Sequence, residues 1–95
     1  MLLSATSHVA TATPARYIAR LCRHFAHRLP VQFDDCHGRI QFDFGLCLLQ
    51  ADDRGLALRV DAPDGQALAK LKHIVGTHFE RFAWRDQLNL EWQPA

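Results

Sequence analysis

The sequence has no apolar run approaching the roughly 20 residues that a membrane-spanning helix requires, because its longest apolar runs are only a few residues long. It also does not start like a secretory signal, since the opening MLL is followed at once by SATSH and no apolar region develops. We therefore expect no membrane as a partner of this chain.

Cysteine is scarce, with three residues that form no C-x-x-C pair and are odd in number. This pattern indicates neither a disulfide framework nor a zinc-finger site, and it favours a reducing compartment. Cys22 and Cys47 fall in apolar patterns, where a free cysteine is usually a small buried hydrophobic residue. We predict a cytoplasmic protein.

Carboxylates are absent from the first third of the chain, where Asp34 is the first acidic residue. Residues 1–33 carry four arginines, residues 34–95 carry seven basic and ten acidic side chains, and the formal net charge is +1. Nucleic-acid-binding domains usually combine a strong basic excess with exposed aromatic residues. The near-neutral balance and the two lysines therefore argue against nucleic acid as a partner.

The familiar catalytic motifs are also missing: there is no GxSxG elbow, no glycine-rich phosphate loop and no HExxH. One thiol–imidazole pair, Cys36 and His37 beside Asp35, lies in the turn-like stretch DDCHG. Neighbouring residues in a turn rarely form a working catalytic dyad. Turn formation explains the acidic residues of this stretch. We assign no catalytic residue and no cofactor.

The sequence does contain a clear succession of helix and strand patterns. Its 95 residues, 48% apolar and 22% charged, are typical of one globular domain, which we expect to span residues 1–95. Alternating apolar residues indicate strands, weakly at 6–12 and more clearly at 31–34, 39–44, 46–51, 56–61 and 88–92. In three of them the inward side chains are Ile40, Phe42 and Phe44; Leu56, Leu58 and Val60; and Leu88, Leu90 and Trp92.

A first amphipathic helix is predicted over residues 15–28, with Thr13 as its N-cap and Pro14 in its first turn. Pro30 forbids much continuation. The apolar residues that recur at helical spacing are Ile18, Leu21, Cys22, Phe25 and Leu29.

A second amphipathic helix is predicted to begin near Asp61. Pro63 falls in its first turn and Asp64 resembles part of a capping arrangement. Its apolar stripe consists of Leu68, Leu71, Val75, Phe79 and Phe82, with Ile74 at the edge.

The element order is therefore β-α-β-β-β-β-α-β. Four consecutive extended segments joined by short turns predict an antiparallel meander, and two long helices must bury their stripes. The fold class that satisfies both is α+β, a two-layer sandwich with an antiparallel sheet and both helices on one face.

Three blocks of the sequence carry a resemblance to a known family: ATATPARYIARLCRHFAHRLPVQFD, GRIQFDFGLCLLQAD and VGTHFERFAWRDQLNLEW. With these blocks the chain resembles, from about Val9 to Trp92, the bacterial proteins catalogued as domain of unknown function twenty-two eighteen. The resemblance implies a small single-domain bacterial protein without an assigned activity. It also implies an association with siderophore-interacting reductases and iron handling, which is a link by association rather than by chemistry.

The segment RLCRHFAHRL, residues 20–29, concentrates cationic side chains on the first predicted helix. On a helix of 3.6 residues per turn its apolar residues face the core, and His27 lies nearly opposite, among the arginines. Three interpretations stay open: a solvated basic face, an anion-binding surface, and a metal site. The candidate ligand or anion contacts are Arg16, Arg20, Arg23, His24, His27, His78 and Arg81.

His78 falls at the centre of the apolar stripe of the second helix, where a histidine most often bonds a backbone carbonyl. The alternative is a ligand or general base in a cleft between the helices. His24 could approach it if the helices pack side by side, so His24 and His78 are our candidate metal ligands. A carboxylate would usually complete such a set, but the candidate Glu80 points off the stripe.

Two functional hypotheses follow. The first is a non-catalytic binding or accessory domain, acting as a dimer or with a protein partner through Leu46 and Leu48, which lie opposite the core face. The second is a small metal-dependent enzyme or metal carrier that uses His24 and His78, with His27 as a further ligand.

Overall fold

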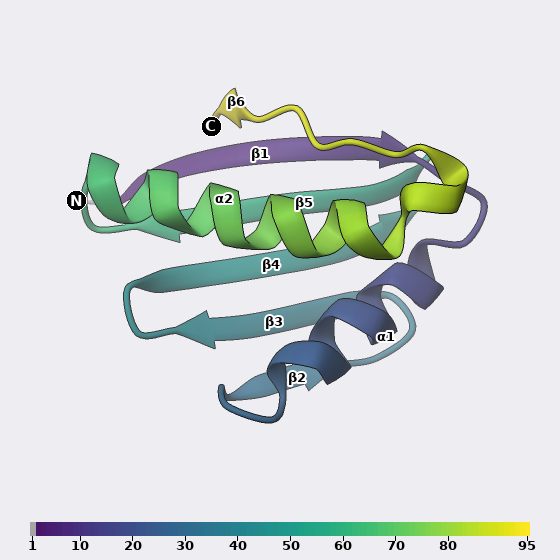
Figure 1. Cartoon of the computed structure of the whole chain (residues 1–95), viewed down its shortest axis with the longest axis horizontal. Coiled ribbons are helices and arrows are strands. Elements are labelled where there is room, and N and C mark those ends of the chain that lie inside the picture. Colours follow the sequence, from purple (N-terminus) through teal and green to yellow (C-terminus); the bar gives the residue numbers. More distant parts are fainter. Residues whose placement is uncertain (1) are drawn as a thin grey trace.

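A six-stranded antiparallel sheet with two helices on one face forms the frame of the molecule (Figure 1). The computed structural model describes residues 2–95. Its elements are β1 (Leu3–Ala10), α1 (Pro14–Phe25), β2 (Val31–Phe33), β3 (His37–Phe42), β4 (Gly45–Asp52), β5 (Gly55–Ala62), α2 (Gly65–Phe82), the 3₁₀-helix η1 (Trp84–Asp86) and β6 (Gln93–Pro94). The predicted α+β class and the order β-α-β-β-β-β-α-β are confirmed.

The strand order across the sheet is β2-β3-β4-β5-β1-β6. Strands β2 to β5 form the expected meander, and β1 inserts between β5 and β6. All eight residues of β1 pair with β5, from Leu3 opposite Ala62 to Ala10 opposite Gly55. Because side chains alternate along each strand, this register gives the sheet one face covered by the helices and one open face.

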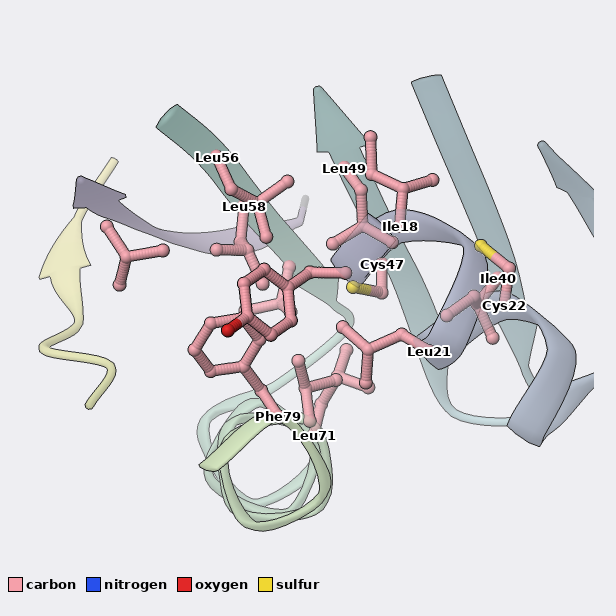
Figure 2. Close-up of a cluster of buried hydrophobic side chains, with 14 of the residues drawn as sticks. Ile18, Leu21, Cys22, Ile40, Cys47, Leu49, Leu56, Leu58, Leu71 and Phe79 are labelled. Carbon is pink, nitrogen blue, oxygen red and sulfur yellow. The ribbon is translucent and has the colours of Figure 1, made fainter. Parts of the chain in front are cut away.

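The core lies between the covered face and the two helices (Figure 2). The predicted inward residues of β5 are all buried, and each helix contributes the middle of its stripe. The fully or nearly fully buried side chains include Ile40, Cys47, Leu49, Leu56, Leu58 and Val60 of the sheet, Ile18, Leu21 and Cys22 of α1, and Leu71, Val75 and Phe79 of α2. Within residues 2–95, no helix is both long and apolar enough to span a membrane.

Gly38 of β3 allows α1 to approach the sheet closely. A Cβ atom at this position would lie 2.9 Å from the Cys22 sulfur and 3.1 Å from Cγ2 of Ile18, both on α1. These separations are shorter than ordinary carbon contacts. The missing side chain is therefore what lets Ile18 and Cys22 pack directly over β3.

Both helices depart from their predicted limits. Helix α1 ends at Phe25, short of Arg28. The amides of Arg28 and Leu29 both donate to the Phe25 carbonyl, so the chain makes one further turn before Pro30. Thr13 precedes Pro14 as expected but makes no side-chain capping bond.

The predicted start of the second helix near Asp61 is wrong. Asp61 belongs to β5, where it pairs with Ser4 and Leu46, and its carboxylate accepts from the Arg59 Nε at 3.0 Å. Helix α2 begins at Gly65, and the Asp64 side chain caps it by accepting from the Ala67 amide at 2.8 Å.

The predicted strand at 88–92 does not form, and the ladder is limited to Gln93 and Pro94. Instead the Glu80 carboxylate accepts the Leu90 amide at 3.1 Å, so a side chain of α2 takes a donor that a strand would offer to its neighbour. The apolar residues of this segment still face inward: Leu88, Leu90 and Trp92 are half-buried against the core. Phe44 likewise packs against the core, but from the turn after β3 rather than from the strand.

Candidate functional site

His24 of α1 and His78 of α2 lie against each other, the approach expected if the two helices pack side by side. Their ring centroids are 4.6 Å apart with an angle of 43° between the rings. His78 Nδ1 lies 2.7 Å from the Ile74 carbonyl oxygen, one turn earlier in the helix. The neutral His78 ring therefore carries its proton on Nδ1 and leaves Nε2 as an acceptor.

The two histidines border a cleft of about 620 Å³ between the helices. Phe25, the last residue of α1, is central to it, because its ring centroid lies 5.1 Å from that of His78 and 5.2 Å from that of Phe42. The remaining walls come from the turn after α1 and from α2. The cleft is lined by His24, Phe25, His27, Arg28, Leu29, Phe42, Ile74 and His78.

The polar side chains that line this cleft are basic, and no acidic side chain is among them. The pKa of His24 is lowered, first by partial desolvation and then by the neighbouring His78, Arg81 and His27. None of the three ion pairs found among residues 2–95 involves a residue of the cleft. The cationic groups here are therefore balanced by no carboxylate partner within the part of the chain that the structure describes.

Metal ligation by this cluster lacks a third ligand. No group of three His, Cys, Asp or Glu side chains is arranged to hold a metal ion within residues 2–95. Cys22 is buried and free on the core side of α1. Glu80 is engaged by the Leu90 amide. The two histidines are adjacent, but a metal bound there would need other ligands.

The predicted anion contacts divide into groups. Arg20 stacks over the Phe82 ring at 5.2 Å, next to His24, whereas Arg23 lies over Phe33 at 5.9 Å, beside β2. Arg16 is exposed near the start of α1 and lines no part of the cleft. The structure thus brings together His24, His27, His78 and Arg28, with Arg20 and Arg81 nearby, and separates Arg16 and Arg23 from them.

The turn containing Cys36 is organised by Asp34, not by the Asp35 singled out in the sequence. The Asp34 carboxylate accepts the amides of Cys36 and His37, each at 2.8 Å. Those two hydrogen bonds lower the Asp34 pKa. The acidic residue here builds a turn, which agrees with the expectation that this stretch is structural.

The open face of the sheet carries a second site, which the sequence showed only as Leu46 and Leu48. Both leucines lie on this face and are half-buried. Leu48 is flanked in register by Arg39 on β3 and Arg59 on β5. The complete row takes one side chain from each of the six strands: Gln32, Arg39, Leu48, Arg59, Thr6 and Gln93.

A hollow of about 950 Å³ lies over this row. Every member of the row lines it, and the side chains around the row include His8, Phe33, Asp34, His37, Gln50, Ala57 and Glu91, whereas Leu46 lies outside. The sequence could not reveal this row, because its members come together only once β1 pairs with β5. The one signal of this row in the sequence was the alternation of inward and outward residues within each strand.

The charges of the open face are mostly paired. Arg59 bonds the Asp61 carboxylate at 3.0 Å and the Ser4 hydroxyl at 3.1 Å. His8 bonds Asp52 at 3.0 Å. Arg39 differs, since among the described residues its guanidinium bonds only the Gln41 amide oxygen, at 3.3 Å. The hollow therefore offers one arginine beside Leu48 without a carboxylate of its own.

The comparisons with known proteins agree with the resemblance in the sequence. Residues 6–93 match the profile of the family described as "Uncharacterized protein conserved in bacteria (DUF2218)". The chain is also similar to PA4090 from Pseudomonas aeruginosa, known from an NMR structure, with 35% identity, a TM-score of 0.80, and coverage of 98% of this chain and 97% of that one. No functionally curated protein shows significant similarity to the sequence.

Proposed function

Because the chain belongs to the bacterial family DUF2218, whose description names no activity, we propose a function from the surfaces of the molecule itself. The chain is a non-catalytic binding domain, and the open face of its sheet is the surface on which a second copy docks. The observation that carries the proposal is the hollow of about 950 Å³ centred on the row through Leu48.

The composition of this face supports docking rather than simple solvation. The solvent-facing side of an antiparallel sheet is usually polar. Here β4 presents Leu46 and Leu48 one after the other, and Ala57 of β5 extends the apolar strip into the neighbouring row. Contiguous apolar surface with a polar border is typical of protein interfaces.

The distribution of charge favours a second copy as the occupant. Arg39 lies toward the β2 edge of the hollow, and Glu91 lines the same hollow from the segment before β6 at the other edge. In a two-fold, face-to-face pair whose axis runs parallel to the strands, each Arg39 would lie above the β1–β6 side of its partner. The unpaired arginine of one copy would then face the carboxylate of the other.

The size of the face is also sufficient. The two longer dimensions of the molecule, 34 and 27 Å, lie in the plane of the sheet (Figure 1). A standard protein interface needs about 800 Å² from each partner, which a face of these dimensions can supply.

A charge exchange tests the proposal. Arg39→Glu and Glu91→Arg should each weaken self-association about tenfold or more, because like charges would then face each other, and the double variant should recover it. Sedimentation velocity over a range of concentrations measures this. Arg16→Glu, on an exposed position of α1 away from the face, is the matched control. A wild-type chain that stays monomeric at high concentration contradicts the proposal.

The family resemblance adds an accessory role in iron or siderophore handling, beside a siderophore-interacting reductase. Its support is the resemblance alone. If the reductase docks on the same open face, adding it should release the second copy, and Leu48→Glu should abolish both associations. A reductase that binds the Leu48→Glu variant as tightly as the wild type contradicts this role.

A metal carrier or metal-dependent enzyme is the second candidate, favoured by the 4.6 Å separation of the His24 and His78 rings and by the free Nε2 of His78. Histidine-ring NMR during titration with zinc and then ferrous iron tests it. Joint, stoichiometric shifts of both rings would support it. Full metal affinity in a variant with both histidines changed to alanine would exclude it.

A further inference from the structure

The cleft between α1 and α2 has a composition that neither the docking face nor the metal alternative uses. Its floor is apolar and its rim is cationic. We propose that this cleft binds a small organic anion with an apolar body, of the chemical class of aromatic carboxylates and sulfonates. The proposal is independent of self-association, because the cleft lies on the helix side of the sheet and the hollow lies on the other.

The apolar floor suits a flat or bulky hydrocarbon. Phe25 and Phe42 meet edge-to-face with centroids 5.2 Å apart, and Leu29 and Ile74 complete the surface. The volume of about 620 Å³ lies within the range of roughly 300–1,000 Å³ typical of small-molecule sites. Burying an aromatic body here would remove apolar surface from water on both partners.

The rim selects the charge of the ligand. Arg28, His24, His27 and His78 all line the cleft, and no carboxylate does. Helix α1 contains no acidic residue at all. Glu80, the only acidic residue of α2, accepts from the Leu90 amide instead. An anionic head group would therefore meet the Arg28 guanidinium without competition from a carboxylate in the lining of the cleft.

Anilinonaphthalene sulfonate is a suitable probe, because its sulfonate stays ionised at all working pH values. Fluorescence at neutral pH measures its affinity. Arg28→Gln should weaken binding about five- to tenfold, because it removes the permanent positive charge of the rim, and His24→Gln should weaken it less. Both side chains are exposed, so neither change threatens the fold. Arg16→Gln, which removes an equal charge from outside the cleft, should change the affinity little.

The location of the bound probe distinguishes the cleft from the open face of the sheet. Side-chain NMR should show shifts at the Ile74 methyl groups and the Phe25 ring, with the Leu48 methyl groups unchanged. Three results would overturn the proposal: shifts at Leu48 in place of Ile74, equal loss in Arg28→Gln and Arg16→Gln, or equal affinity for uncharged anilinonaphthalene. The last result would mean that the cleft binds apolar molecules without selecting for negative charge.

Discussion

The two faces of the sheet are made by the same strands and differ almost completely in what they do. Leu49 of β4 is 2% exposed beneath the helices, whereas its neighbours Leu48 and Gln50 line the open hollow. The covered face packs side chains from every long element into one core, while the open face arranges single side chains in rows. Residues one position apart therefore contribute separately to the core and to the proposed docking face, and we expect each to be alterable with little effect on the other.

The sharpest test of this separation is a pair of leucines next to each other in the chain. Leu49→Ala should lower the free energy of unfolding by about 3 kcal/mol, since it leaves a cavity in a packed core. Leu48→Ala should cost less than about 1 kcal/mol and should weaken self-association instead. Denaturant titration at low protein concentration measures the first effect, and sedimentation the second. Similar losses of stability in the two variants would break the comparison.

A second test adds volume to the covered face. Gly38→Ala should destabilise the fold by about 1–3 kcal/mol, because the new methyl group meets the Cys22 sulfur at 2.9 Å and Leu49 Cδ1 at 3.0 Å. Gly65→Ala is the control, since nothing lies within 4 Å of a Cβ there, and it should be neutral or slightly stabilising. Equal thermal midpoints for Gly38→Ala and the wild type would show that α1 is not held close to β3.

The buried cysteines extend the comparison to the pH dependence of stability. Burial raises the pKa of Cys22 from its ordinary value of 9.0 to about 11, and it also raises that of Cys47, whereas Cys36 is exposed. A raised folded-state pKa stabilises the fold fully below about pH 9, and this stabilisation is lost as pH rises toward 11 and beyond. Unfolding free energies measured on both sides of pH 9 should show this decline, and Cys22→Ala should make it shallower.

Thiol labelling of the native protein provides the matching readout. A disulfide reagent should modify Cys36 quickly, and Cys22 and Cys47 only at the rate of unfolding. Rapid modification of all three thiols at neutral pH would mean that the covered face opens far more readily than its packing indicates.

The smallest expected effect has the opposite sign. Ser7, 6% exposed on the covered face, has a hydroxyl oxygen with no hydrogen-bond partner among the described residues. Ser7→Ala should therefore stabilise the protein, by up to about 1 kcal/mol. Thr6→Ala, one residue away on the open face, should leave stability nearly unchanged. A clear loss of stability in Ser7→Ala would reveal a partner for this hydroxyl.

The covered face was largely predictable from the sequence because hydrophobic periodicity reports burial directly. The stripes of both helices and the inward residues Leu56, Leu58 and Val60 follow from spacing alone. The approach of His24 to His78 could be anticipated only on the condition that the two helices pack side by side, which spacing within each helix does not determine.

The open face was not predictable, because its rows depend on pairing between distant segments. Nothing within β1 specifies that Thr6 will lie beside Arg59. Local patterns also misled where tertiary contacts overrule them. Leu88, Leu90 and Trp92 alternate like a strand, yet Glu80 takes the Leu90 amide and the segment packs irregularly.

The position of β1 has a consequence for the order in which the molecule folds. This strand is made first, but both of its partners, β5 and β6, lie later in the chain. The meander from β2 to β5 needs only short loops, so it can form early, while β1 must wait for residues 55–62. We expect mutations at the β3–β4 contact to slow folding and mutations in β1 mainly to speed unfolding. During synthesis, β1 thus finds its first partner only after the meander has been made.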